Sequence, residues 1–94
     1  MLRVLVLLLS EPTRDDWYAL QVVRETKMGS GTVVQILFRL EHWGWVVSRW
    51  EDVEDARNHR RPRRKFYRLT GTGALRAKHY LEAAFPRLLR LQPT

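Results

Sequence analysis

Residues 29–44 read GSGTVVQILFRLEHWG, a short glycine-containing turn followed by a stretch with helical periodicity. Four apolar side chains recur at steps of three and four and predict the buried stripe of a helix from Gly31 to about Trp43: Val33, Ile36, Leu37 and Leu40. A polar set recurs on another face and predicts a solvent-facing stripe: Thr32, Gln35, Arg39 and His42. Gly29 or Ser30 can cap this helix, and Gly44 stands where a left-handed residue would end it.

Two elements are predicted before this helix. The run Met1–Leu9 is so uniformly apolar that periodicity cannot distinguish a buried strand from a buried helix. A break at residues 10–12 follows, and Thr13-Arg14-Asp15-Asp16 has the hydroxyl and carboxyl spacing of a helix start. We therefore expect a helix from about Arg14 to Lys27 that buries one stripe of side chains: Tyr18, Ala19, Val22 and Val23.

Two short runs rich in aromatic and β-branched residues come after the helix. They are Trp45–Trp50 and Lys65–Leu69, and they predict the two strands of one hairpin. The connection between them, residues 51–64, begins acidic and turns basic, so it is too highly charged to belong to a core. We expect this connection to be a protruding, mobile loop.

A last helix is predicted after the hairpin. Thr70-Gly71-Thr72-Gly73 has the pattern of a helix cap, and the apolar residues beyond it follow coiled-coil spacing. The seam consists of Ala74, Ala77, Leu81, Ala84, Leu88 and Leu91. Such a seam requires another helix to pack against. Pro86 removes a backbone donor and is expected to end or kink the helix near Phe85.

The order helix, helix, helix, strand, strand, helix predicts a winged helix-turn-helix, a mostly α fold with a small β-hairpin (α+β). We place a DNA-binding domain at residues 1–71 and a dimerisation helix, packed on the same domain, at residues 72–94. In this plan the helix after the glycine turn enters the major groove of duplex DNA. Small or hydrogen-bonding side chains near its start, Ser30, Thr32 and Gln35, suit base edges, while Arg39 and His42 suit phosphates.

The basic half of the connection supplies positive charge. The cationic side chains between residues 57 and 68, which include two in the following strand and have no acid among them, are Arg57, Arg60, Arg61, Arg63, Arg64, Lys65 and Arg68. They predict phosphate contacts and an affinity that falls steeply with salt. The excess of arginine over lysine favours contact with the backbone or insertion into a narrow minor groove.

Composition restricts the class of protein. The chain has 94 residues, 45% of them hydrophobic, which suffices for one small domain that would gain stability from pairing with a second copy. A formal net charge of +7 points to a polyanionic partner. The absence of cysteine excludes disulfides and thiolate metal sites. The apolar N-terminal run is too short for a signal sequence or a membrane span, so we expect a cytoplasmic protein with no membrane partner.

We expect no catalytic site, no cofactor and no metal. The three histidines, His42, His59 and His79, lie at no spacing that builds a zinc site. The carboxylates cluster in the connection predicted to be mobile, where neither burial nor fixed geometry would tune them for catalysis.

Several motifs resemble those of the PadR-like family of transcriptional regulators, over roughly residues 5 to 80. One is Gly31-Thr32-Val33-Val34 followed by Leu37, Arg39-Leu40-Glu41 and Gly44; another is the second strand, residues 63–70, followed by Gly73. Tyr18 resembles the tyrosine of the family's Gly-Tyr pair. The chain departs from the pattern at two positions: Val34 replaces a tyrosine usually found near DNA, and Trp17 replaces the glycine before Tyr18.

The resemblance implies a cytoplasmic repressor of the subgroup with a short C-terminal helix, and it implies that Met1–Leu9 is helical. It also implies a homodimer in which the last helix packs on the first helix of the other subunit. The expected DNA-binding residues are Ser30, Thr32, Val34, Gln35, Arg39, Arg60, Arg61, Arg63, Arg64 and Lys65. The expected dimer contacts are Leu5, Leu8, Ala77, Leu81, Ala84, Phe85 and Leu88.

Two further possibilities stay open. The fold could serve as a protein-binding or RNA-binding module without specific DNA recognition. Trp43, Trp45 and Trp50, expected mainly as packing residues, could instead line a pocket for a small-molecule effector.

Overall fold

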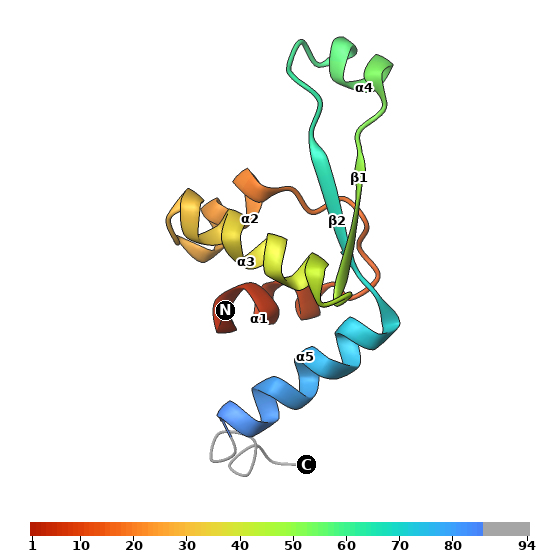
Figure 1. Ribbon diagram of the computed structural model, residues 1–94. Coiled ribbons are helices and arrows are strands. Elements are labelled where there is room, and N and C mark those ends of the chain that lie inside the picture. The colour runs from red at the N-terminus through yellow and green to blue at the C-terminus, as the bar shows by residue number, and fades with distance from the viewer. Residues whose placement is uncertain (86–94) are drawn as a thin grey trace.

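The stretch at residues 29–44 folds as predicted in the computed structural model, which describes residues 1–85. Helix α3 spans Ser30–His42 (Figure 1), and its predicted inner stripe is buried in full. Gly29 precedes the helix as an extended N-cap residue, and Gly44 adopts a φ of +76°, a conformation that glycine tolerates without strain. The helix, its buried stripe and its glycine end are therefore confirmed.

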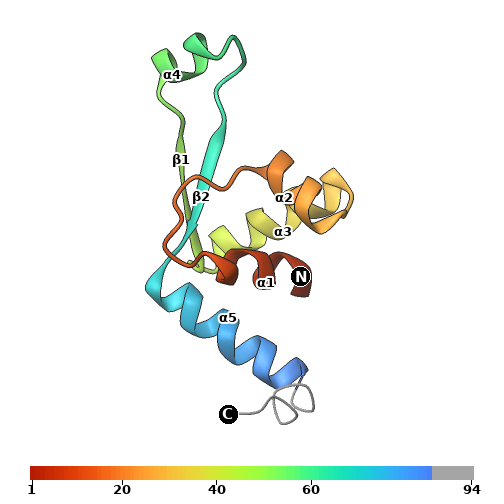
Figure 2. The same cartoon turned by 180° about the vertical axis from the view of Figure 1, so that it is seen from behind.

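The N-terminal run forms helix α1, Leu2–Ser10, as the family resemblance implies. Val4, Leu5 and Leu8 are fully buried, and the helix packs against α2 and α5. Figure 2 shows α1 on the near side of the molecule, between α3 and α5. This helix therefore supplies the centre of the core.

Helix α2 spans Ala19–Thr26, so the predicted start at Arg14 is wrong. The reason is a contact with a distant segment. Trp17 and Tyr67 exchange two backbone hydrogen bonds, with N···O distances of 2.7 and 3.3 Å, and form an isolated antiparallel bridge. This pairing keeps the chain extended up to Tyr18, which is the N-cap residue of α2. The hydroxyl and carboxyl pattern at residues 13–16 starts no helix. The Arg14 N–H closes a turn on the Glu11 carbonyl at 3.0 Å, and the Arg14 Nε lies 2.5 Å from Asp16 Oδ1.

Trp17 is a core residue that the sequence pattern does not reveal. Its side chain is fully buried, and the guanidinium of Arg14 lies 4.0 Å from the ring centroid. Of the stripe predicted for α2, Val22 is fully buried, whereas Tyr18, Ala19 and Val23 are partly exposed. The bridge to Tyr67 therefore turns the segment before α2 into part of the core.

The predicted hairpin is confirmed. Strand β1, Val46–Trp50, pairs antiparallel with β2, Lys65–Leu69, in a register that sets Val46 opposite Leu69 and Trp50 opposite Lys65. Val46 and Leu69 are buried at the base of the hairpin, whereas the other strand residues are half-buried or exposed. The hairpin therefore rises from the core, as Figure 1 shows.

The connection at the far end of the hairpin contains a helix, so its prediction as a loop is wrong. Helix α4, Val53–Asn58, begins at Asp52, whose Oδ1 accepts hydrogen bonds from the backbone N–H groups of Glu54 and Asp55. Glu54 and Asp55 lie in its first turn and Arg57 in its last, the arrangement that favours a helix dipole. The same charges that exclude the segment from a core thus stabilise a helix. The prediction that the segment protrudes is confirmed, because α4 lies at the tip of the hairpin (Figure 1).

Helix α5, Gly71–Ala84, begins at the predicted cap, where the Thr70 hydroxyl accepts a 2.8 Å hydrogen bond from the Gly73 N–H. It packs along α1 with Ala77 fully buried, and it ends at Ala84. The end near Phe85 is as predicted. Pro86, Leu88 and Leu91 lie outside the described residues.

Three helices, the hairpin base and α5 thus surround one core, and the predicted winged helix-turn-helix fold is confirmed. The described chain is elongated, with extents of 48 × 26 × 25 Å, because the hairpin and α5 extend in opposite directions from the body (Figures 1 and 2). Within residues 1–85, no helix is long and apolar enough to cross a lipid bilayer.

Candidate nucleic-acid interface

The outer face of α3 is exposed and carries a polar stripe without a free acid. Thr32, Gln35, Arg39 and His42 all lie at the surface, as predicted, and so does Ser30 in the first turn. Glu41 is the acid of this helix, and it is turned towards the hairpin. Its carboxylate accepts a hydrogen bond from the Ser48 hydroxyl and lies 3.5 Å from the Lys65 ammonium. These contacts join α3 to both strands and neutralise Glu41.

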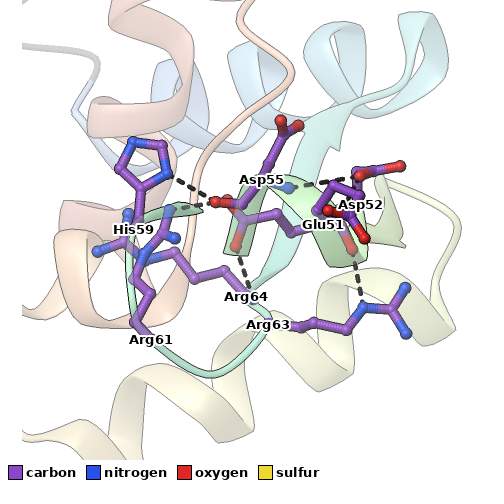
Figure 3. Close-up of polar contacts among 8 residues, drawn as sticks. Glu51, Asp52, Asp55, His59, Arg61, Arg63 and Arg64 are labelled. Carbon is purple, nitrogen blue, oxygen red and sulfur yellow. Dashed lines mark hydrogen bonds and ion pairs between the residues drawn. The ribbon is translucent and has the colours of Figure 1, made fainter. Parts of the chain in front are cut away.

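A buried acid organises the connection at the end of the hairpin. Glu51 is only 4% exposed, and its Oε2 accepts a 2.7 Å hydrogen bond from Arg61 Nη2 while its Oε1 accepts a 3.3 Å bond from the Arg64 N–H. The Glu51 carbonyl accepts a 2.8 Å bond from Arg63 Nε. Figure 3 shows these arginines around Glu51, next to the capped start of α4. The expectation that burial and fixed geometry are missing from this segment is therefore wrong for Glu51.

The expected wing cations differ in how far their charge reaches solvent. Arg61 forms an ion pair with Glu51. Its side chain is 21% exposed, and its Nη1 is buried with no hydrogen-bond partner in the described chain. Arg60 and Arg63 are exposed. Arg64 and Lys65 are half-buried, with the Arg64 guanidinium 3.9 Å from the ring centroid of Tyr18. We call Arg63, Arg64 and Lys65 the wing neck. Arg60 lies outside it, in the turn after α4, where its N–H donates to the Arg57 carbonyl at 3.0 Å.

The tip beyond the wing neck carries acids. Glu54 and Asp55 on α4 are exposed, and Glu54 pairs with the equally exposed Arg57, at 3.3 Å. Positive charge is therefore concentrated between α3 and the tip. The ion pair of Lys65 with Glu41 and the stacking of Arg64 on the Tyr18 ring place this positive charge next to α3 and the start of α2.

Two further exposed cations lie on the outer face of the hairpin. Arg49 stands opposite Phe66 in the register and Arg68 opposite Val47, and the Arg49 guanidinium lies 4.9 Å from the Phe66 ring centroid. Arg49 was not among the expected DNA-binding residues. Strand alternation could have identified it, because residues 47, 49, 66 and 68 share one face of the sheet. On the opposite face, burial raises the pKa of the Tyr67 phenol, with Lys65 opposing this shift, so the phenol stays neutral near pH 7.

The tryptophans proposed as effector-pocket walls do not gather at one cavity. Trp43 and Trp45 pack together, with ring centroids 5.2 Å apart, while Trp50 is exposed near the wing neck beside Arg63. The hollow at Trp43 is lined otherwise by α3 and includes neither Trp45 nor Trp50. The structure thus gives no support to an effector site formed by the three tryptophans.

Three of the expected dimer contacts need correction. Leu5, Leu8 and Ala77 are fully buried in the chain's own core, because α5 packs along α1 of the same chain, and they are not accessible to a partner. Leu81 is half-buried, Ala84 and Phe85 are exposed, and Leu88 lies outside the described residues. Phe85 lines two neighbouring apolar hollows, one with Leu2, Val6 and Leu7, and one with Met1, Leu2 and Tyr80.

Comparison with known proteins agrees with the resemblance found in the sequence. The model of the transcriptional regulator PadR-like family matches residues 18–79, a range that contains α2, α3, the hairpin and the first part of α5. None of the curated proteins matches the chain.

Proposed function

The chain belongs to the PadR-like family of transcriptional regulators and is a DNA-binding regulator by family, and on that premise we propose that it is a homodimeric repressor of a specific promoter. The observation that carries this proposal is the acid-free outer face of α3 beside the cationic wing neck. Occupation of promoter DNA excludes polymerase sterically, so repression needs no further surface. We propose that it acts in the cytoplasm.

In the proposed complex, α3 enters the major groove. Its first two turns present Ser30, Thr32, Val34 and Gln35, all exposed, to the base edges. Arg39, one turn later, is placed for a phosphate at the groove edge. Because Glu41 is turned away and neutralised by Lys65, no carboxylate of α3 opposes the phosphates.

The wing neck follows the adjacent backbone or minor groove. Arg60 and Arg63 supply the most accessible charge, and Arg64 and Lys65 lie closer to the helix pair. Arg61 keeps a supporting role, because its guanidinium is already bound to Glu51. Glu54 and Asp55 of α4 repel phosphates, so at the tip the expected contact comes from Arg60, in the turn after the helix.

The proposed dimer uses the exposed apolar surface of α1 and the end of α5. Val6 is 54% exposed in the middle of α1, on the side opposite the buried residues, and it lines one hollow with Phe85. We assign dimerisation to residues 72–94, and we expect helix α5 of the second copy to cover these hollows. A twofold axis would then present two α3 helices to two half-sites about one helical turn apart.

Selection of duplexes from a random pool, followed by electrophoretic shift assays at several salt concentrations, tests the proposal. A discrete, partly palindromic preferred sequence is expected, with a steep loss of affinity as salt rises. Weak, uniform retention of all duplexes would instead support an interaction module without specific DNA recognition.

Two single substitutions should separate base recognition from phosphate contact. Gln35→Ala is expected to lower discrimination at one base pair about tenfold, because a polar base contact contributes roughly 1–3 kcal/mol to discrimination. Arg60→Asn is expected to weaken binding to all duplexes equally and to reduce the slope of log affinity against log salt concentration by about one. Asparagine suits this position because Arg60 has a φ of 53°, which asparagine tolerates well. Equal effects of both variants on discrimination would contradict these roles.

Val6→Lys should dissociate the dimer. Each dimer loses the burial of two valine side chains, which contribute roughly 1.5 kcal/mol or more each to the free energy of association. The dimer dissociation constant should therefore rise at least about a hundredfold. Light scattering or sedimentation over a concentration series measures this change. Val47→Lys is the matched control, since Val47 is an exposed valine on the hairpin, and its mass distribution should stay that of the wild type. An unchanged mass for Val6→Lys would exclude this face from the interface.

A further inference from the structure

The centre of the outer face of α3 is apolar. Phe38 is 70% exposed, the largest fraction among the exposed large hydrophobic residues of the described chain, and Val34 is 53% exposed. The two residues are one helical turn apart, and both stand apart from the buried stripe of α3. Exposure of a phenylalanine to water is unfavourable, so a partner that covers both side chains would bind more tightly because of the apolar area that it buries.

The surroundings of these side chains indicate what covers them. Val34, Phe38 and Trp43 line an open hollow of about 650 Å³ together with Gln35, Arg39 and His42, and no carboxylate lines it. The amide, imidazole and guanidinium groups can bind a polyanion, and the apolar centre can pack against apolar groups on the surface of that polyanion. A second copy paired symmetrically through this face would bring its own Arg39 against Arg39 here, and the two cations would repel each other.

We propose that Val34 and Phe38 recognise the C5-methyl groups of thymines in the major groove, so that the preferred half-site carries thymine opposite the middle of α3. This inference rests on the proposed DNA binding. The thymine methyl is the apolar group that base pairs present in the major groove. Residues 34 and 38 are about 6 Å apart along the helix axis, and base pairs rise about 3.4 Å, so the two methyls should lie one or two base steps apart.

The probe is the selected duplex in which single thymines are replaced by deoxyuridine. This change removes the methyl group and leaves the hydrogen-bonding edge intact. The wild-type chain should bind about fourfold more weakly for each contacted methyl, the factor that corresponds to about 0.8 kcal/mol per methyl-sized group. Replacement of thymines outside the half-site should have no effect.

The variant Phe38→Ala should lose the preference for thymine over deoxyuridine at one position, and Val34→Ala should lose it at the neighbouring position. Val47→Ala, which shortens an exposed valine on the hairpin, should keep both preferences. Because Phe38 and Val34 are exposed, all three variants should melt within a few degrees of the wild type. The deoxyuridine series with the wild-type chain needs no variant, so it tests the inference even if one fails to fold.

The outcomes separate the inference from the function on which it rests. If no preferred duplex is selected, the proposed DNA recognition fails. If a preferred duplex is selected and every deoxyuridine replacement in the half-site leaves affinity unchanged, the methyl contact is overturned while the function stands. If Phe38→Ala changes the oligomeric state of the free protein and leaves the thymine preference intact, Phe38 serves contacts between copies and the inference is overturned.

Discussion

Replacing Gly73 with alanine should lower the free energy of unfolding by about 3 kcal/mol or more, although alanine is the better helix former. A Cβ at residue 73 would lie 2.6 Å from the Cα of Trp45 and closer still to its carbonyl, and both are backbone atoms that cannot move aside. The start of α5 is tied to the same turn by hydrogen bonds from Thr70, whose N–H donates to the Trp45 carbonyl at 3.0 Å and whose hydroxyl donates to the Gly44 carbonyl at 2.8 Å. Overpacking against fixed backbone therefore outweighs helix propensity.

Gly71→Ala is the matched control, two residues away in the same turn. A Cβ at residue 71 meets no atom within 4 Å, so this variant should be as stable as the wild type or up to about 1 kcal/mol more stable. Thermal unfolding measures both, and a loss of 3 kcal/mol corresponds to a fall in Tm of roughly 10–25 °C for a domain of this size. A Gly73→Ala protein that melts at or above the wild-type temperature would show that α5 does not pack against the turn as described.

Replacing Glu51 with alanine should unfold the tip of the hairpin while the helical core stays intact. The change leaves Arg61 as a largely buried cation without its partner and removes the acceptor of the Arg64 N–H, at a cost of about 3 kcal/mol. The loss is local because the core lies at the other end of the hairpin. Amide exchange should therefore accelerate about a hundredfold for Glu51 and Arg61, whose N–H groups donate within this segment, and should not change in α1.

Glu51→Ala should weaken DNA binding, although the loss of an acid would be expected to strengthen it. Glu51→Ala and Glu54→Ala each remove one acid, and charge alone predicts tighter DNA binding for both. We expect Glu51→Ala to bind about tenfold more weakly, because the wing neck loses its order, and Glu54→Ala to bind slightly more tightly. The Glu54–Arg57 pair is about 70% exposed on both sides, so its loss should leave amide exchange nearly unchanged. Tighter binding by Glu51→Ala would show that the ordered connection does not contribute to the interface.

The amino-acid sequence alone was enough to identify elements that depend on neighbours within one or two turns. Helix α3 follows from an apolar stripe at helical spacing, and its end follows from a glycine with a left-handed φ. The strands follow from short runs of aromatic and β-branched residues, and the start of α5 from a threonine cap. The family was also evident, because its motifs coincide with these local features. Helix α4 could have been found in the same way from the Asp52 cap, which the run of charges concealed.

Tertiary structure decided the features that depend on residues far apart in the chain. The pairing of Trp17 with Tyr67 delays the start of α2, and no local pattern contains this information. In α1 nearly every side chain is apolar, so periodicity cannot separate the buried Leu5 from the exposed Val6, and the positions of α2 and α5 do so. Likewise, Glu51 and Arg61 are ten positions apart, and their pairing removes one cation from the surface that charge counting assigns to DNA. Local sequence patterns indicate which secondary structure each segment prefers, whereas the burial of each side chain depends on which distant segments pack against it.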